Sequence, residues 1–183
     1  MSSIELLLLD YIRGHYFGKY RGTVTDNQDP ASLGRLKVKI PAVLVDQEVW
    51  AMPCVPYAGP NVGFYSLPPV GSGVWLEFEA GDPSYPVWTG CFWADNELPT
   101  SSGPDVKIWK TGSLTVQLDD SSGELLIQNS KNSKTTYSDD VKTESGGATH
   151  SVGSDGVVSE IGAGKVEVTQ ASVSVNNGAM QVV

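Results

Sequence analysis

Positive charge is scarce in this sequence. Its 183 residues contain 12 Lys and Arg against 21 Asp and Glu, which gives a formal net charge of −9. A surface that binds the phosphates of nucleic acids needs clustered Lys and Arg. The first 104 residues hold six basic residues against eleven acidic ones, although most of the aromatic residues lie there. Nucleic acid is therefore not an expected partner.

Cysteine and histidine are equally scarce. Cys54 and Cys91 are the only cysteines, and no CxxC or Cys/His cluster exists, so a structural zinc site is not expected. A pair of cysteines can form a disulfide, but two cysteines in a chain without a secretion signal are more often reduced. Because a free Cys is usually a small buried apolar residue, both are predicted to be reduced and buried.

No apolar run in the sequence is long enough to cross a bilayer. The N-terminal run Ile4–Leu9 is interrupted by an acidic residue and has no basic segment before it. Ser2 and Glu5 have the spacing of a capping box, which predicts a short helix from about Ser3 to Ile12 within residues 1–15. We expect the protein to be made and folded in the cytoplasm.

The first half has the pattern of a small β-barrel. Leu36, Val38 and Ile40 alternate with basic residues, which is typical of a strand with one face in water. Gly34 and Gly71 are expected to permit tight entry into strands. Five short antiparallel strands suit a closed or nearly closed Greek-key barrel of the OB type, because closure removes exposed sheet edges. The barrel is predicted over residues 16–97, with strands at 18–25, 34–40, 49–54, 73–79 and 87–92.

Proline and aromatic residues almost disappear after Pro104. Residues 98–104 are rich in Pro, Gly and Ser and are predicted to be a linker. Residues 105–183 contain one Trp, one Tyr and no Phe, Pro or Cys. Folded alone, they would bury too little apolar surface to offset the entropy of ordering the chain. Their recurring alternation argues against disorder and favours a core shared between chains, in the form of a β-helix. The alternating sets are Leu114, Val116 and Leu118, then Leu125 and Ile127, then Val166 and Val168, then Val173 and Val175.

Five blocks of the first half resemble the central baseplate spikes of contractile injection machines. That family includes phage baseplate assembly spikes, the valine-glycine repeat spikes of type VI secretion, and the spikes of extracellular phage-tail-like particles. The resemblance covers about residues 16–95 and keeps the expected order of the blocks, which makes it more specific than any single motif. The blocks are Tyr16–Pro30, Leu33–Pro41, Trp50–Pro60, Gly63–Glu79 and Gly81–Trp93.

The resemblance implies an all-β architecture and a mechanical function. An OB-like barrel would precede an intertwined trimeric β-helical needle over residues 105–183. The homotrimer would bind the baseplate hub through its barrels and a PAAR-like tip protein through its C-terminal end, and it would touch the target membrane only during puncture. Trp75, Phe78 and Trp88 are expected to fill the barrel or its trimer contacts. No enzymatic activity and no cofactor are expected, and the spike would become part of a baseplate or injection particle after assembly in the cytoplasm.

The spacing of the second half also predicts the dimensions of the needle. At roughly eight residues per strand and turn, residues 105–183 give about ten strands, and three intertwined chains would form a needle roughly 45–55 Å long in which each face gains strands from successive chains. The apolar sets should point inward. The repeat is imperfect between Lys131 and His150, so no register is predicted there. Val182 and Val183 would leave a blunt apolar platform that a tip protein is expected to cover.

Catalytic, cofactor-binding and metal-binding residues are not predicted. Glu77 and Glu79 could form an acid–base pair on one strand face, but a solvated face with spaced carboxylates is the favoured interpretation. The pairs Asp119-Asp120 and Asp139-Asp140 fit turns better than metal sites. His150 could bind a metal together with its two copies on a threefold axis, although a surface or turn position is the favoured interpretation.

Two other functions share part of this evidence. A carbohydrate-binding tail fibre or adhesin would have the same Ser- and Thr-rich β-structure, and only the barrel motifs argue against it. A spike-associated cell-wall hydrolase would need a catalytic module. No nucleophile motif, Ser/His/Asp order or phosphate loop is present in the sequence to support one.

Overall fold

The computed structural model describes residues 3–100 and 103–183. The described chain forms two compact units that divide between Leu98 and Pro99. The predicted linker spans this division, and its residues 101 and 102 lie outside the described residues. Among the helices that the structure describes, none has the length and apolar character that a membrane span requires.

A single α-helix begins the first unit. Helix α1 is Ser3–Gly14, so it ends two residues beyond the predicted Ile12. Ser2 of the predicted capping box lies outside the described residues. None of the residues of α1 is buried, and six of its seven large apolar side chains are each at least half exposed. The helix therefore adds nothing to the core of the barrel that follows it.

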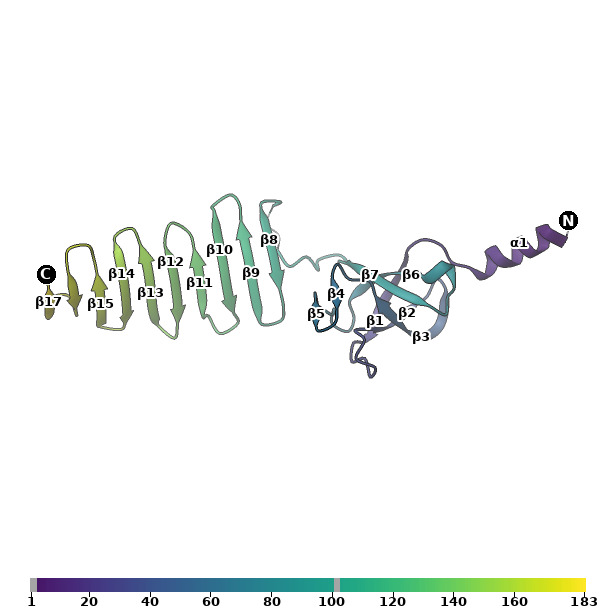
Figure 1. Ribbon diagram of the computed structural model, residues 1–183, viewed down its shortest axis with the longest axis horizontal. Coiled ribbons are helices and arrows are strands. Elements are labelled where there is room, and N and C mark those ends of the chain that lie inside the picture. Colours follow the sequence, from purple (N-terminus) through teal and green to yellow (C-terminus); the bar gives the residue numbers. More distant parts are fainter. Residues whose placement is uncertain (1–2, 101–102) are drawn as a thin grey trace. The chain divides into compact units, whose positions relative to one another are not determined.

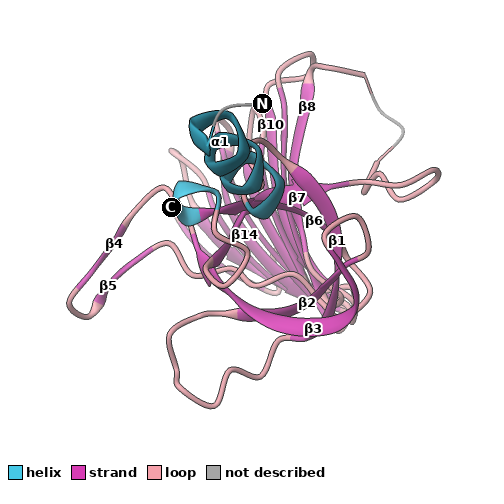
Figure 2. Ribbon diagram, turned by 90° about the vertical axis from the view of Figure 1, so that its right-hand side faces the viewer, coloured by secondary structure: helices cyan, strands magenta, loops and turns pink. Residues whose placement is uncertain are grey.

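Five strands close the barrel in the order β1-β2-β3-β7-β6, with β6 pairing back onto β1 (Figure 2). This closure confirms the predicted five-stranded OB-like barrel. One detail of the prediction is wrong, because β3 and β7 pair in parallel through Met52 and Val87, while the other four pairings are antiparallel. The strands are β1 (Tyr20–Asp26), β2 (Leu36–Ile40), β3 (Leu44–Pro53), β6 (Gly73–Phe78) and β7 (Pro86–Phe92).

Period-two alternation fills the interior of the barrel. Phe78 and Trp88 are buried there as expected, whereas Trp75 lies outside and packs against Phe92 with ring centroids 5.1 Å apart and an interplanar angle of 54°. Gly34 and Gly71 have φ values of 73° and 94°, a region that favours glycine, so the tight entries expected at these positions are present. The buried hydrophobic core consists of Val24, Leu36, Val38, Ile40, Ala51, Val74, Leu76, Phe78 and Trp88.

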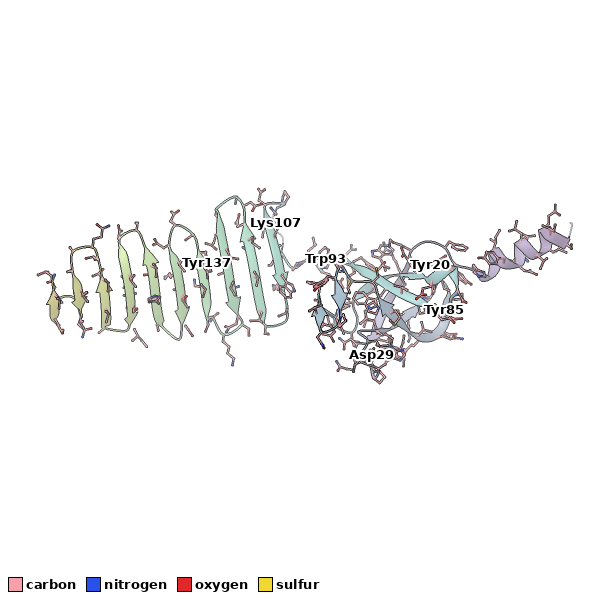
Figure 3. The ribbon with its side chains drawn as sticks, in the orientation of Figure 1. Tyr20, Asp29, Tyr85, Trp93, Lys107 and Tyr137 are labelled. Carbon is pink, nitrogen blue, oxygen red and sulfur yellow. The ribbon has the colours of Figure 1, made fainter. Side chains whose placement is uncertain are left out.

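Asp29 organises the loop between β1 and β2 (Figure 3). Its carboxylate accepts hydrogen bonds from the backbone N–H groups of Ala31 and Leu33 and forms an ion pair with Arg35, whose Nη2 lies 2.7 Å from Asp29 Oδ1. The hydrogen bonds from the Arg35 side chain hold the pKa of Asp29 well below its usual range, and the backbone N–H groups add to this effect. The loop is therefore fixed by charge where it has no apolar core.

A small hairpin that the sequence did not predict extends from the barrel (Figure 2). It pairs β4 (Ala58–Gly59) with β5 (Val62–Gly63), and its turn contains Asn61 at a φ of 59°. Asn tolerates this left-handed conformation better than most residues. Each strand is only two residues long, which is too short to give an alternation that sequence reasoning could detect.

The second unit is one open antiparallel sheet of ten strands (Figure 1). Ten strands is the number that the sequence predicted. Each strand pairs with the next strand of the same chain. The expectation that each face of the needle takes its strands from successive chains is therefore wrong. The strands are β8 (Val106–Lys110), β9 (Leu114–Asp119), β10 (Glu124–Asn129), β11 (Lys134–Tyr137), β12 (Val141–Ser145), β13 (Ala148–Gly153), β14 (Gly156–Ile161), β15 (Gly164–Val168), β16 (Val173–Val175) and β17 (Met180–Val182).

The strand register is continuous between Lys131 and His150, where no register was predicted. Tyr137 lies opposite Val141, and Thr143 lies opposite His150, so β11, β12 and β13 form an unbroken ladder. Asn176 and Asn177, in the turn between β16 and β17, have φ values of 48° and 54°. Short turns connect each strand to the next, and the sheet is a simple meander.

The two cysteines are free but exposed, so the prediction that they are buried is wrong. Cys54 follows the last residue of β3, and Cys91 lies opposite Val74 close to the end of β7. Partial burial raises the pKa of the Cys91 thiol above its ordinary value. Both positions are at strand ends, where a small side chain reaches solvent.

We expect two free thiols per chain when the protein is denatured without reductant and titrated with a thiol reagent. In the folded protein, Cys91 should react more slowly than a model thiol at the same pH, because its raised pKa lowers the fraction of reactive thiolate. Mass spectrometry of the labelled peptides would separate the two sites. A mass deficit of two hydrogens, with no label incorporated, would contradict the free-thiol assignment.

Candidate functional site

The sheet of the second unit has one apolar face and one charged face. Residues directly opposite each other in an antiparallel pair point to the same side, so the register assigns each side chain to a face. Apart from the C-terminal Val183, every exposed large apolar residue described after Gly103 falls on a single face, which we call the apolar face. They are Trp109, Leu114, Leu118, Ile127, Tyr137, Val141, Val152, Ile161, Val166, Val168, Val173, Met180 and Val182.

No described residue after Gly103 is buried. Ile161 and Met180 are each 63% exposed, and Trp109 is 60% exposed, although all three lie within strands. Contiguous apolar surface of this extent is uncommon on a soluble monomer and marks an interaction surface. The sheet therefore lacks a layer that would cover its apolar face.

The apolar face consists of columns that run across the strands. An outer column contains only apolar residues over nine strands: Leu118, Leu125, Tyr137, Val141, Val152, Val157, Val168, Val173 and Val182. The column in the middle of the strands, which we call the central column, is apolar at both ends and polar between them. In order it contains Trp109, Val116, Ile127, Thr135, Thr143, His150, Ser159, Val166, Val175 and Met180.

Hydrogen bonds join the polar residues of the central column. The Oγ1 atoms of Thr135 and Thr143 are 3.2 Å apart, and His150 Nδ1 lies 2.7 Å from Ser159 Oγ. A shallow hollow of about 530 Å³ opens beside them and is lined by Thr143, His150, Ser159 and Val166 among others. His150 is exposed, as the favoured surface position predicted, but it lies in the middle of strand β13 on the apolar face and not in a turn.

Ion pairs occupy the opposite face. Lys134 and Lys142 lie 2.8 Å and 3.1 Å from the carboxylate of Glu144, and Lys165 lies 3.2 Å from Glu167. The hydrogen bonds from Lys134 and Lys142 lower the pKa of Glu144, and the bond to Glu144 raises the pKa of Lys134. Exposed pairs of this kind contribute little to stability. Their position shows which face is adapted to water.

The barrel carries its own apolar surface around the β4–β5 hairpin. A groove of about 540 Å³ there is lined by Leu33, Tyr57, Phe64, Tyr65 and Trp88 together with small residues. No Lys or Arg lines this groove. Stacking of single-stranded nucleic acid requires basic groups beside the aromatic rings, so this surface fits an apolar contact better.

Residues 20–93 match the type VI secretion system/phage-baseplate injector OB domain. The match begins at the first residue of β1 and ends one residue after β7, so it coincides with the closed barrel. It supports a structural role of the phage-baseplate type. None of the curated proteins compared with the sequence matches it.

The acidic residues that were considered for catalysis or metal binding do not form a site. Strand β6 ends at Phe78 and Glu79 lies in a 3₁₀ turn, so the expectation that Glu77 and Glu79 share a strand face is wrong. Glu77 instead forms an ion pair with Lys19 at 2.6 Å. Within one chain, the described residues contain no group of three or more His, Cys, Asp or Glu that could hold a metal.

Three of the four residues of the two Asp pairs lie in turns or bends, as predicted, and Asp119 is the last residue of β9. Asp119 accepts hydrogen bonds from the backbone N–H and the hydroxyl of Ser121, which lower its pKa. Asp120 forms an ion pair with Lys107. Asp140 accepts a backbone hydrogen bond from Ser138 in the turn between β11 and β12. These contacts account for both pairs as local turn structure.

Proposed function

We propose that the protein is the non-enzymatic, homotrimeric central spike of a contractile injection system. Three copies of the ten-stranded sheet would form the sides of a prism, with their apolar faces inward and their ion-paired faces in water. The single observation that carries this proposal is the segregation of thirteen exposed apolar side chains onto one face. The match of residues 20–93 to the injector OB domain supports assigning the protein to such a system.

The magnitudes favour association over a folded monomer. Full burial of a large apolar side chain contributes about 1.5–3 kcal/mol. Because the thirteen side chains are already about half covered, assembly would add on the order of 10 kcal/mol per chain. The loss of translational and rotational freedom costs about 4–15 kcal/mol for each of the two association steps, or about 8–30 kcal/mol in all, and the summed gain of about 30 kcal/mol from three chains offsets this cost.

The composition of the central column favours three sheets over two. A face-to-face pair of sheets packs about 10 Å apart and would press Thr135, Thr143 and His150 against the partner sheet without water. Around a threefold axis, the same side chains would surround a channel that has room for water or an ion. With strands about 4.8 Å apart, ten strands give a shaft of roughly 45 Å, close to the expected length.

The proposed mechanism is mechanical. Contraction of a sheath would drive an inner tube forward, and the spike would lead it through the target envelope. Dense cross-strand hydrogen bonding and a core shared by three chains would slow unfolding under load, where kinetic stability matters more than equilibrium stability. The barrels would bind the baseplate hub, and the exposed edge of β17 would bind a PAAR-like tip protein. The injection particle would be the site of function after assembly in the cytoplasm.

Sedimentation velocity tests the oligomeric state directly. The full-length protein should sediment as a homotrimer, and a chain truncated after Pro104 should be a folded monomer or a weak oligomer, because it retains the barrel core but loses the apolar face. Circular dichroism of the truncated protein would verify that the barrel is folded. A stable full-length monomer or dimer would contradict the proposed spike.

The C-terminal edge provides a second test of the proposal. Val182 lies opposite Val173 on the apolar face, whereas Val183 follows the last strand and is 95% exposed. We expect Val183→Asp to weaken binding of the tip protein at least tenfold and to leave the trimer intact, because only the platform at the end gains a charge. Thr169→Asp, in the turn before β16, is the matched control. Binding of the tip protein by Val183→Asp at wild-type affinity would exclude this docking surface.

A further inference from the structure

We propose that the three α1 helices of the assembled spike pack against one another as a short parallel three-helix bundle. The inference rests on the proposed function, because it requires three copies of the chain. The partner of the apolar surface of α1 is then the same surface of the two other copies. This contact between the chains is separate from the apolar face of the sheet.

The first observation is an exposed apolar stripe along α1. Ile4, Leu8 and Tyr11 lie nearest the centre of the stripe, at the four- and three-residue steps of helices that pack in parallel. A helix of twelve residues is marginal alone in water, and helices in proteins owe most of their stability to the packing of such a stripe. The helix therefore needs a partner. The members of the stripe are Ile4, Leu7, Leu8, Tyr11 and Ile12, which are 52–74% exposed.

The second observation is the placement of the charges of α1. Counted at about 100° per residue, Arg13 lies almost opposite the centre of the stripe, and Glu5 and Asp10 lie to either side of it. Three helices packed stripe to stripe would therefore bury no charge. A helix that lies on a membrane surface carries Lys and Arg beside its apolar face. The acidic residues in those positions favour a protein partner over a lipid surface.

The third observation is that the end of α1 is fixed to the barrel. The rings of Tyr11 and His15 stack with their centroids 3.9 Å apart. The N–H of Tyr16 donates to the carbonyl of Gly81 at 2.7 Å, and the ring of Tyr16 packs against Phe78. Three barrels joined in one trimer would therefore hold three helices at a high effective concentration.

The area of the stripe shows that the bundle depends on the trimer. A large apolar side chain removes roughly 60–120 Å² from water when it is fully buried. Because the side chains of the stripe are slightly more than half exposed, three stripes together would bury roughly 500–1,100 Å². A stable interface needs about 1,200–2,000 Å². The helices would thus not associate alone, but they would pack once the sheets hold the chains together.

Disulfide trapping in the full-length protein tests the bundle. Leu8→Cys is introduced together with Cys54→Ser and Cys91→Ser, because both native thiols are exposed. Three thiols that meet around an axis can form one disulfide, so mild oxidation should convert about two thirds of the chains to covalent dimers on a non-reducing gel. Leu6→Cys in the same background is the matched control, because Leu6 lies on the side of α1 opposite the stripe. It should give less than about a tenth of that yield.

Proteolysis gives a second measurement without cysteine chemistry. Trypsin cleaves after Arg13, which lies in the last turn of α1. Leu8→Asp should speed this cleavage about tenfold while the mass remains trimeric, because a packed helix opens less often than a free one. Leu6→Asp should cleave at the wild-type rate.

Sedimentation of the same samples separates this proposal from the proposed function. A trimer in which Leu8→Cys does not cross-link, or in which Leu6→Cys cross-links as well, would overturn the bundle and leave the spike standing. The stripe would then be free for another protein of the particle. A protein that is not a trimer would overturn both proposals.

Discussion

Ile127→Asp is expected to abolish the trimer. Ile127 lies on the apolar face in the central column, between Val116 and Thr135, and it remains 44% exposed in the single chain. Assembly would bring three aspartates together in the interior, where unpaired buried charges cost several kcal/mol each. We expect this free-energy cost to exceed the net free energy of association of the three sheets. Sedimentation at micromolar concentration should then show monomers or soluble aggregates.

Gln128→Asp is the matched control for this change. Gln128 is the next residue of β10, points to the charged face and lies opposite Lys134. An aspartate there gains a basic neighbour and stays in water, so the mass should remain trimeric and the melting temperature should change little. If both variants stayed trimeric, the face that we assign to the interior would be wrong. If both dissociated, the sheet would bury both of its faces.

The part of the fold that could be predicted is the part where local pattern and burial coincide. In β2, Leu36, Val38 and Ile40 alternate with charged residues and are fully buried. The parallel pairing of β3 with β7 could not be predicted, because the direction of two strands far apart in sequence depends on the path of the chain between them. The first half of β3 was also missed, since Asp46, Gln47 and Glu48 look like a loop, although Glu48 forms ion pairs with Lys37 and Lys39 across the strands.

The apolar sets of the candidate site were predicted from the sequence, but the positions of its middle strands were not. Val166 and Val173 belong to sets that pointed to a shared core, and both lie on the apolar face. Strands β11 to β13 were not located, because Thr135, Thr143 and His150 interrupt the apolar alternation at its centre. Only the register shows that these polar residues continue the central column. Strands β11 to β13 could have been located from the sequence if small polar residues had been allowed at positions that face the proposed threefold axis.

The barrel should be stabilised independently of the sheet, and Leu76→Ala is the change that tests this. Leu76 is fully buried and lies opposite Trp88 at a β-bulge between β6 and β7. Removing most of a buried leucine leaves a cavity and costs about 2–5 kcal/mol. We therefore expect the melting transition of the barrel to move down by roughly 10 °C or more, while the mass of the protein remains that of the trimer.

Glu77→Ala is the control on the same strand, because it removes only an exposed ion pair with Lys19 and should cost less than about 1 kcal/mol. Protein concentration then distinguishes the two units. The transition of an isolated core does not depend on concentration, whereas that of a sheet stabilised by association rises with it. Calorimetry of Leu76→Ala over a hundredfold range of concentration should show two transitions. The temperature of the barrel transition should be lowered and should not depend on concentration, whereas the temperature of the sheet transition should rise with concentration. A single cooperative transition that shifts as a whole would show that barrel and sheet unfold as one unit.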